Sequence, residues 1–256
     1  MTALASHGVA LRNDDTRYAK IALQDILKHE GDVILLAILR LSDERTGNGA
    51  LWSETLEQLV PMAAPSREDI AMRRAADLLT SATSNLRTWM LDNPLDSVSG
   101  HVVLSQAIDE IGRATLESHF SGHFSSEPLN EIVAGLAERI DAVRPSVSNW
   151  SELIRAVSAE DAVSLMTIHR SKGLEYHAVI VLGLDDNQWW SYGRDVQEAT
   201  SAYFVALSRA KQRLIVSRAT ANAGGNNTRR FYELLHQAGV TGSTPDTFVV
   251  PERDNS

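Results

Sequence analysis

The 256-residue sequence contains no cysteine and no long apolar run. The missing cysteine excludes disulfides and zinc–thiolate sites and fits a cytoplasmic protein, which is the location we expect. No stretch is apolar over the length of a membrane helix, and no basic region followed by an apolar one opens the chain, so neither a transmembrane segment nor a signal peptide is expected. Histidines and carboxylates are too scattered to predict a metal site.

Lysine is scarce, and its positions exclude one kind of site. The four lysines are Lys20, Lys28, Lys172 and Lys211, and none follows a glycine. The phosphate-binding loop of an ATPase ends in Gly-Lys-Ser/Thr, and its Mg²⁺ needs an acidic residue at a strand end. The sequence therefore contains no Walker A motif, and the chain is not expected to hydrolyse ATP alone.

Positive charge is concentrated in the C-terminal part of the acidic chain. Residues 1–150 carry 21 acidic and 13 basic side chains, whereas residues 151–256 carry 12 and 11. The segment from Val163 to Arg230 contains nine basic and five acidic side chains. Because phosphate neutralisation dominates nucleic-acid affinity, any such contact is expected in this part.

Two short apolar runs, Val163–Ile168 and Ala178–Leu184, predict buried strands of a parallel sheet, and a further strand is predicted over Arg213–Ser217. The first run leads into His169–Glu175, which places two cations, a histidine, a glycine and a carboxylate in seven residues. Open α/β sheets bind ligands at the carboxyl ends of their strands. This loop is therefore the leading candidate for a ligand site.

A helix is predicted over Val196–Arg209, with Tyr203 and Phe204 at core-facing spacing. It leaves Arg209 and Lys211 at its C-terminal end. Cations at this position often only complement the helix dipole, so a structural role is the alternative to a binding role for both.

The first 150 residues are predicted to be helical almost throughout, with Gly31 as a break and no strand of comparable strength. The helices expected there and at the C-terminus are Thr16–Glu30, Asp32–Glu44, a short helix that Ser53 caps and that ends before Pro61, Ser66–Met90, Leu129–Val143, Asn149–Val157 and Thr228–Ala238.

Two ordered strings point to a known family. TIHRSKGLEY at Thr167–Tyr176 is followed some thirty residues later by YFVALSRAKQRL at Tyr203–Leu214. They resemble motifs V and VI of the superfamily 1A DNA helicases of the UvrD/Rep type, whose usual wording is close to T-x-H-x-x-K-G-L-E-F and Y-V-A-L-T-R-A-K. The resemblance covers about a quarter of the chain strictly and nearly all of it loosely.

The resemblance implies an α/β fold: a partial RecA-like parallel sheet with flanking helices, preceded by an all-helical accessory domain. The accessory domain is expected over residues 1–158, with about the first 15 open to assignment to the RecA-like domain, and the RecA-like domain over residues 159–256. Leu4–Asp15 resembles the L-x-x-x-G-I-P-Y-R segment where these helicases leave that domain. The family's first RecA-like domain, with the Walker motifs, has no counterpart in the sequence.

For ATP, the resemblance implies three site residues. Arg209 resembles the motif VI arginine finger, which reaches the γ-phosphate held by the other RecA-like domain, and would be the catalytic residue. Glu175 resembles the carboxylate that contacts the ribose, and Gly173 shapes its loop. An arginine offers a planar, permanently charged fork for phosphoryl oxygens, and a glycine permits close approach of the backbone. The alternative for Glu175 is a local ion pair with Arg170 or Lys172.

For DNA, the resemblance implies that Thr167 and His169 contact the single strand or couple it to ATP, with Lys172 in the same loop. Such side chains donate to a DNA backbone. For His169 the alternative is a hydrogen bond at the start of a helix.

One segment departs from the family. In place of E-E-G-x-x-P the chain has Asp185-Asp186-Asn187-Gln188-Trp189-Trp190, which resembles a UvrD-like subgroup found in Gabija-type antiphage systems beside nuclease partners. Trp189 and Trp190 either form a base-stacking platform or fill a gap between the RecA-like core and the helical insertion. Packing is the expected role for at least one of them.

Two functions follow from these observations. The first is the C-terminal half of an ATP-dependent UvrD-like DNA helicase or translocase, which supplies an arginine finger and part of the single-stranded DNA track. ATP and Mg²⁺ would then bind only with a first RecA-like domain, in cis or in trans, and a nuclease subunit is a further candidate partner. The second is a non-catalytic helicase-derived module that binds a protein partner or DNA.

Overall fold

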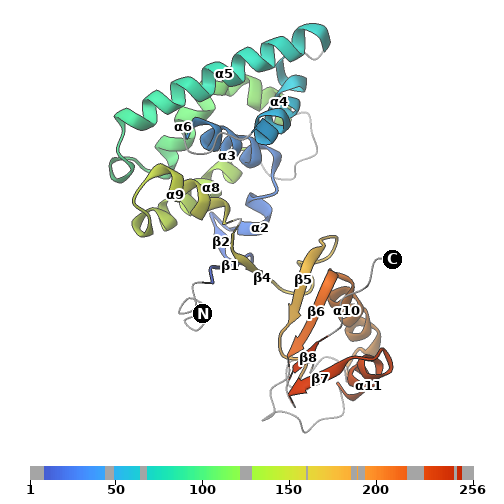
Figure 1. Ribbon diagram of the computed structural model, residues 1–256. Helices are drawn as coiled ribbons and strands as arrows, with labels where there is room; N and C mark the ends of the chain where they lie inside the picture. The colour runs from blue at the N-terminus through green and yellow to red at the C-terminus, as the bar shows by residue number, and fades with distance from the viewer. Residues whose placement is uncertain are drawn as a thin grey trace. The chain divides into compact units, whose positions relative to one another are not determined.

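The structure of the chain is a computed structural model (Figure 1). Contacts divide the chain into two units, Met1–Leu165 and Met166–Ser256, and each is described by itself. None of the helices in the described part is long and apolar enough to span a membrane. The described residues are 9–43, 49–63, 68–121, 129–159, 161–185, 189, 194–217, 228–244 and 247–249.

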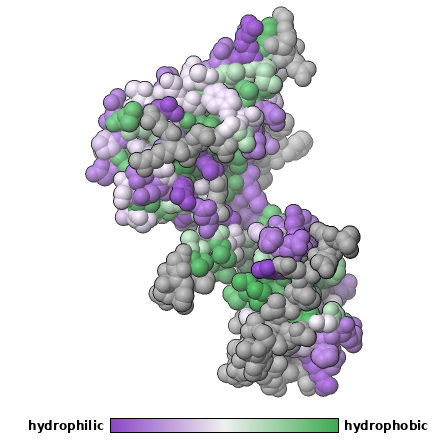
Figure 2. All heavy atoms as spheres, in the orientation of Figure 1, coloured by the Kyte–Doolittle hydropathy of each residue, from purple (hydrophilic) through white to green (hydrophobic). Residues whose placement is uncertain are grey.

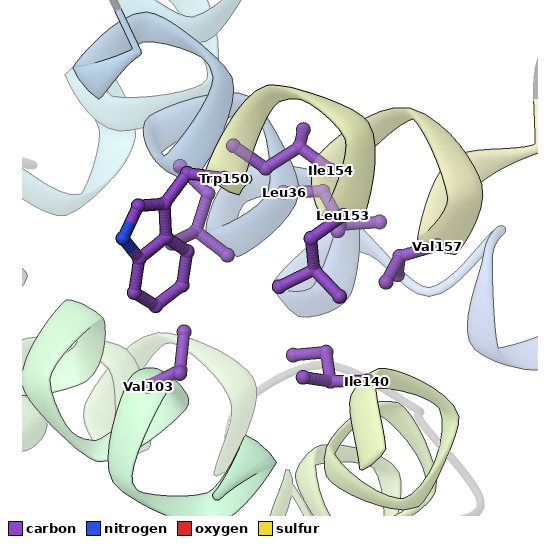
Figure 3. A pocket seen from close by; sticks show the side chains of 8 residues that line it. Leu36, Val103, Ile140, Trp150, Leu153, Ile154 and Val157 are labelled. Carbon is purple, nitrogen blue, oxygen red and sulfur yellow. The ribbon is translucent and has the colours of Figure 1, made fainter. Parts of the chain in front are cut away.

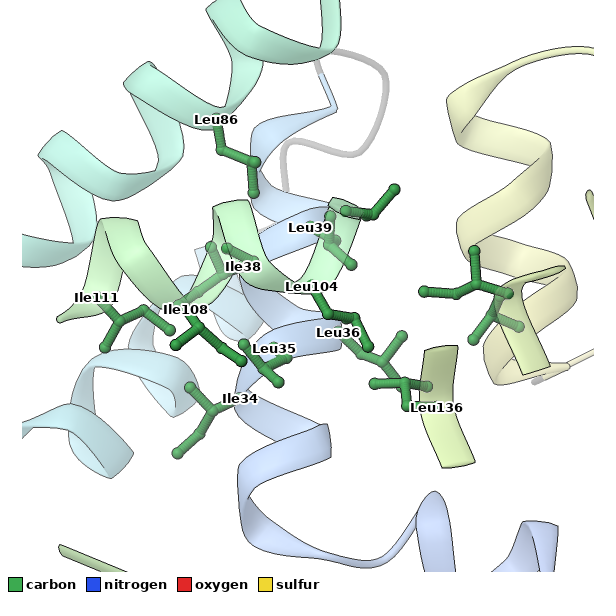
Figure 4. Close-up of a cluster of buried hydrophobic side chains, with 14 of the residues drawn as sticks. Ile34, Leu35, Leu36, Ile38, Leu39, Leu86, Leu104, Ile108, Ile111 and Leu136 are labelled. Carbon is green, nitrogen blue, oxygen red and sulfur yellow. The ribbon is translucent and has the colours of Figure 1, made fainter. Parts of the chain in front are cut away.

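The first unit is a helical bundle built around α3, Glu30–Ser42. Nearly every residue of α3 between Gly31 and Leu39 is buried, which is typical of a helix surrounded by others. Figure 4 shows its leucine and isoleucine side chains meeting those of the neighbouring helices. The other helices of the unit are α2 Leu23–Ile26, α4 Gly49–Ala63, α5 Glu68–Asp92, α6 Gly100–Ile111, α7 Arg113–Ser121, α8 Leu129–Val143 and α9 Trp150–Ser158, with the 3₁₀ turns η2 Leu95–Ser97 and η3 Arg144–Ser146.

Side-chain caps set where several of these helices begin. The His29 ring accepts a hydrogen bond from the Gly31 N–H, so Gly31 lies inside α3 and the break predicted there is wrong. Asn149 caps α9 by accepting from the Glu152 N–H at 2.9 Å. Such caps satisfy backbone donors that the first helical turn leaves unpaired. Pro61 lies within the last turn of α4, so the helix end predicted before it is also wrong.

The helix predicted over Thr16–Glu30 is absent. Its place is taken by a hairpin of β2 (Arg17–Tyr18) and β3 (Ile21–Ala22), followed by the short α2. Ala19 and Lys20 between the strands have φ of 46° and 72°, which turns the chain back on itself.

Val163–Ile168 is a strand only in its first half. β4 (Val163–Leu165) pairs in parallel with β1 (Leu11–Asn13). After β4 the backbone turns, because the Arg170 and Ser171 N–H groups both donate to the Thr167 carbonyl. The strand predicted over Val163–Ile168 therefore ends three residues early, at Leu165.

The second unit holds a four-stranded sheet in the order β5-β6-β8-β7. β5 (Tyr176–Val181) and β6 (Ala210–Ser217) pair in parallel, which confirms the predicted pairing of these segments. β8 (Thr247–Val249) and β7 (Thr241–Thr244) extend the sheet in antiparallel orientation, which the sequence did not predict. The chain is thus a mixed α/β protein, mostly helical with small parallel sheets.

Two helices, α10 (Val196–Ser208) and α11 (Arg229–Gln237), cover one face of this sheet (Figure 1). Tyr203 of α10 stacks on Phe231 of α11 with ring centroids 4.1 Å apart, and Trp189 meets the Phe231 ring edge-on at 5.2 Å. Trp189 is therefore packed within the core of this unit, and the gap-filling role expected for at least one tryptophan stays a prediction. Trp190 lies outside the described residues.

The opposite face of β5 is exposed and apolar. Ile180 and Leu182 are 54% and 66% exposed, and Figure 2 shows hydrophobic surface over this strand. Phe204 of α10 is 70% exposed, so its predicted core-facing position is wrong. Its neighbour Tyr203 already fills the position that faces the sheet.

Candidate functional site

One small hollow in the helical unit carries no site. Trp150 lines it, but the indole Nε1 donates to the Met90 carbonyl at 3.0 Å. All of its lining residues are apolar, so no polar group is available to orient a ligand. The hollow is shown in Figure 3 and is lined by Leu36, Leu39, Val103, Ile140, Trp150, Leu153, Ile154 and Val157.

The loop before β5 consists of successive turns that hold its polar side chains outward. The Lys172 N–H donates to the His169 carbonyl at 3.3 Å, and the buried Ser171 hydroxyl donates to the Ile168 carbonyl at 2.7 Å. Thr167, His169 and Lys172 are exposed. The structure thus places the three residues predicted to face DNA on one solvent-facing loop.

Gly173 ends these turns in a left-handed conformation with φ of 82°. A Cβ atom there would meet nothing within 4 Å, so the backbone conformation, and not crowding, is the reason for glycine. The turn continues with the Leu174 N–H donating to the Ser171 carbonyl at 3.0 Å. The chain then enters β5 through Glu175.

Arg209 caps the C-terminal end of α10 and is half-buried. Its Nε donates to the Val205 carbonyl at 3.1 Å, and its Nη2 donates to the Ser208 hydroxyl at 2.9 Å. Its Nη1 reaches across to the Leu174 carbonyl at 2.8 Å. The arginine therefore ties the end of the helix to the loop that carries Glu175.

Glu175 forms an ion pair with Lys211, with Nζ and Oε2 3.2 Å apart. A local ion pair was the alternative expected for Glu175, but with Arg170 or Lys172 as the partner. The parallel register that places Tyr176 opposite Ala210 brings Lys211 close. Both side chains are more than half exposed, so the pair stabilises the fold by at most about 1 kcal/mol and leaves the carboxylate accessible.

The structure brings Gly173, Glu175 and Arg209 together where β5 and β6 begin. This is the amino edge of the parallel pair, whereas the predicted site was the carboxyl end of a strand. The difference arises because Arg209 ends the helix that precedes β6, and the strand before the loop pairs with β1. Sequence reasoning placed Lys211 beside Arg209 but did not pair it with Glu175, and it did not include Ser208, because only the register and the helix end bring these residues to Glu175 and Arg209.

These features define a class. A helix that ends in an arginine connects two parallel strands, and the rest of the chain is largely helical. This arrangement agrees with a RecA-like C-terminal helicase domain with helical flanks, as the fold prediction stated.

Comparison with known proteins gives the family. Residues 145–221 match the UvrD-like helicase C-terminal domain. DNA helicase II of Escherichia coli (strain K12) and that of Salmonella typhimurium (strain LT2) are each 26% identical over 250 residues, which cover 90% of this chain. A putative ATP-dependent DNA helicase, YjcD of Bacillus subtilis (strain 168), is 40% identical over 95 residues, 31% of this chain and 12% of that protein.

These matches support a UvrD-like superfamily 1 helicase C-terminal part as the identity of this chain. The chain spans 32% of the length of the two DNA helicase II proteins that it matches.

Proposed function

We propose that this chain is the C-terminal half of an ATP-dependent UvrD-like DNA helicase or translocase, in which Arg209 is the arginine finger. The observation that carries the proposal is the position of Arg209 at the amino edge of the parallel strands, tied to the Glu175 loop. A sheet of this kind holds its own ligands at the carboxyl edge. An arginine at the other edge suits a nucleotide that another domain holds.

Arg209 has donors to spare for that task. A guanidinium carries five N–H groups, and three of them are used in the bonds to Val205, Ser208 and Leu174. Two N–H groups therefore remain for phosphoryl oxygens while the side chain stays anchored. An arginine finger that is held in place loses little conformational freedom when it engages.

ATP fits these residues only in part. Arg209 would contact the γ-phosphate and Glu175 the ribose, with Gly173 giving the loop its shape. Within the described residues no three His, Asp or Glu side chains group into a metal site, so Mg²⁺ would be held by the domain that carries the phosphate-binding loop. ATP and Mg²⁺ are thus proposed to act only with a first RecA-like domain, in cis or in trans.

Single-stranded DNA is the proposed substrate of the loop with Thr167, His169 and Lys172. All three are exposed on consecutive turns, and the surrounding sequence is the basic part of the chain. We expect binding by the chain alone to be weak, to fall as salt rises, and to map to the second unit. Crosslinking to an oligothymidine tests this, since crosslinks confined to residues 1–150 would contradict it.

The decisive test is ATP turnover in trans. The chain alone is expected to show no ATPase activity with or without DNA, because no lysine follows a glycine. Mixed with a first RecA-like domain that carries a Walker A motif, it should restore DNA-stimulated turnover. Arg209→Lys should lower that turnover by roughly 10³-fold or more while sparing assembly, because lysine keeps the charge but loses the planar fork.

Arg229→Lys is the matched control, since Arg229 is an exposed helix arginine that pairs only locally with Glu233 at 3.0 Å. It should leave turnover unchanged. Equal rates for wild type and Arg209→Lys would show that Arg209 is only a helix-end cation.

A second candidate function rests on the exposed apolar residues Ile180 and Leu182, on the side of the sheet that α10 and α11 leave uncovered. Exposed apolar surface that gathers on one face marks protein–protein contacts. A non-catalytic module that binds a protein partner would use this surface and would need neither Arg209 nor Glu175. Such a module would bind its partner equally well after Arg209→Lys, with no turnover in any mixture.

The proposal of a nuclease subunit as a further partner rests only on the resemblance of the sequence Asp185–Trp190 to that of a UvrD-like subgroup. Within that segment, the structure describes Asp185 and Trp189, both buried. Copurification of the chain with the product of a neighbouring nuclease gene would test this proposal, and its absence would leave the helicase proposal intact.

A further inference from the structure

Three neighbouring bonds converge on Glu175 from the end of α10 and the start of β6. We propose that Arg209 is, besides a phosphate-facing residue, the positioning residue for Glu175: it fixes the peptide groups on both sides of that residue. What Glu175 contacts rests on the function proposed above. The positioning itself rests only on contacts within this chain.

The geometry is that of a clamp on one residue. The Arg209 guanidinium donates through Nη1 to the carbonyl of Leu174, which belongs to the peptide group before Glu175. The Arg209 backbone carbonyl accepts from the Tyr176 N–H at 2.8 Å, and this N–H belongs to the peptide group after Glu175. Both bonds reach residues more than thirty positions away in sequence, so neither follows from the local turn.

The guanidinium bond is the stronger of the side-chain contacts. A hydrogen bond from a charged donor stabilises more than an ordinary one, and the half-buried Arg209 is partly shielded from water. The Lys211–Glu175 ion pair is exposed and weak. The turns through Gly173 set the local shape of the loop, whereas the bonds of Arg209 attach the loop to the end of α10. Arg209 therefore dominates the placement of Glu175.

The bonds of Arg209 would couple phosphate binding at its guanidinium to the position of Glu175. Because two N–H groups of Arg209 remain unused, a phosphate can bind the same guanidinium that holds the Leu174 carbonyl. Any shift of Arg209 toward the phosphate then pulls on the peptide before Glu175. The phosphate end and the Glu175 end of a nucleotide site would thus be linked through one side chain.

Amide hydrogen exchange in the isolated chain tests the clamp by NMR. In Arg209→Gln, the Tyr176 and Leu174 amides keep their own acceptors, the Arg209 and Ser171 carbonyls, but the loop loses its anchor at the Leu174 carbonyl and opens more often. Both amides should therefore exchange about tenfold to a hundredfold faster than in wild type, because opening the loop no longer breaks a hydrogen bond from a charged donor. Ser208→Ala is the matched control: it removes another acceptor of Arg209 but leaves the Leu174 bond. It should leave both amides unchanged, as should Lys211→Met, which removes only the exposed ion pair.

A second measurement, the NMR signals of the Arg209 Nη groups, tests the clamp in the wild-type chain. In wild type, the bonds at Nη1 and Nη2 should slow rotation of the guanidinium and give separate Arg209 Nη signals, and Lys211→Met should preserve them. A freely rotating guanidinium, or equal exchange of the Tyr176 and Leu174 amides in wild type and Arg209→Gln, would overturn the proposal. Amides of α11, in the same unit but away from the Glu175 loop, should be unchanged in every variant, and they report whether that unit is folded.

The results separate this inference from the proposed function. Faster exchange in Arg209→Gln with no turnover in trans would uphold the positioning role and refute the helicase role. Unchanged exchange together with lost turnover in Arg209→Lys would leave Arg209 as a finger alone.

Discussion

Asp32 is an aspartate in the first turn of α3 with none of its surface exposed. Neither carboxylate oxygen has a hydrogen-bond partner in the described part of the chain. Burial raises the pKa of Asp32 from its ordinary 3.8 to about 9, because the charged form loses its hydration. We therefore predict that Asp32→Asn stabilises the chain at neutral pH.

The size of the effect follows from linkage. Below pH 4 the carboxyl of Asp32 is protonated in both the folded and the unfolded chain, so it favours neither. Between pH 4 and about 9 the unfolded chain releases the proton and the folded chain keeps it, so stability falls by about 1.4 kcal/mol per pH unit. At pH 7 the loss reaches about 4 kcal/mol, a large part of the 5–15 kcal/mol typical of a domain.

The helix N-terminus opposes this loss, since it favours negative charge at Asp32. Its contribution is only about 0.3–1 kcal/mol in the first turn, so burial dominates. Asparagine has nearly the same shape as aspartate and no charge. We expect Asp32→Asn to have no effect near pH 4 and to raise the free energy of unfolding progressively up to pH 7.

Urea unfolding followed by circular dichroism between pH 4 and pH 8 measures this effect. Glu30→Gln is the control, because Glu30 lies in the same first turn but is exposed. It should change stability by less than about 0.5 kcal/mol at any pH. A gain for Asp32→Asn that does not depend on pH, or a carboxyl signal of Asp32 that titrates near pH 4 in the folded chain, would refute the reasoning.

Two further predictions concern packing. Gly100→Ala should destabilise the helical unit by about 3 kcal/mol in urea unfolding, because a Cβ there would lie 2.8 Å from the Ala137 carbonyl carbon; Gly49→Ala, with nothing within 4 Å, should cost little. Trp189→Ala should destabilise the second unit by about 3–5 kcal/mol through lost contact with Phe231, and faster exchange of that unit's amides alone would show it. Wild-type stability in Gly100→Ala, or uniform exchange changes in Trp189→Ala, would contradict these predictions.

The helices with strong local signals could be predicted from the sequence. α8 has the predicted bounds, Leu129–Val143, and α9 starts at the cap that Asn149 provides. α10 runs from Val196 to Ser208, one residue short of the prediction. In each case the cap residue and the apolar period lie within the element itself, so no distant contact is needed to place it.

The helix predicted over Thr16–Glu30 was wrong because contacts with residues far away in sequence determine the conformation of this segment. The Ala19 N–H donates to the Glu138 carboxylate, and Arg139 donates to the Tyr18 hydroxyl at 3.0 Å. These bonds to α8 hold the hairpin in place of a helix. Helical periodicity in Thr16–Glu30 is real, but a pattern within the segment carries no information about α8.

The residues of the candidate site could be predicted from the sequence, but the contacts between them could not. Motif wording named Gly173, Glu175 and Arg209, and the structure places them together. That Arg209 bonds the Leu174 carbonyl, 35 residues away, follows from the register of β5 on β6, which no string of residues states. The roles of these residues toward ATP and DNA stay predictions.

The two units differ in the size of their apolar cores and in how much apolar surface they expose. The helical unit has a continuous apolar core around α3 and tolerates one buried, unpaired carboxylate, Asp32, at a cost that the core outweighs. The second unit has a smaller core and exposes the apolar face of β5, so it has more to gain from a partner. Under the proposed function, Arg209 at the amino edge and the exposed apolar residues of the sheet would both meet another domain, and ATP turnover in trans tests this directly.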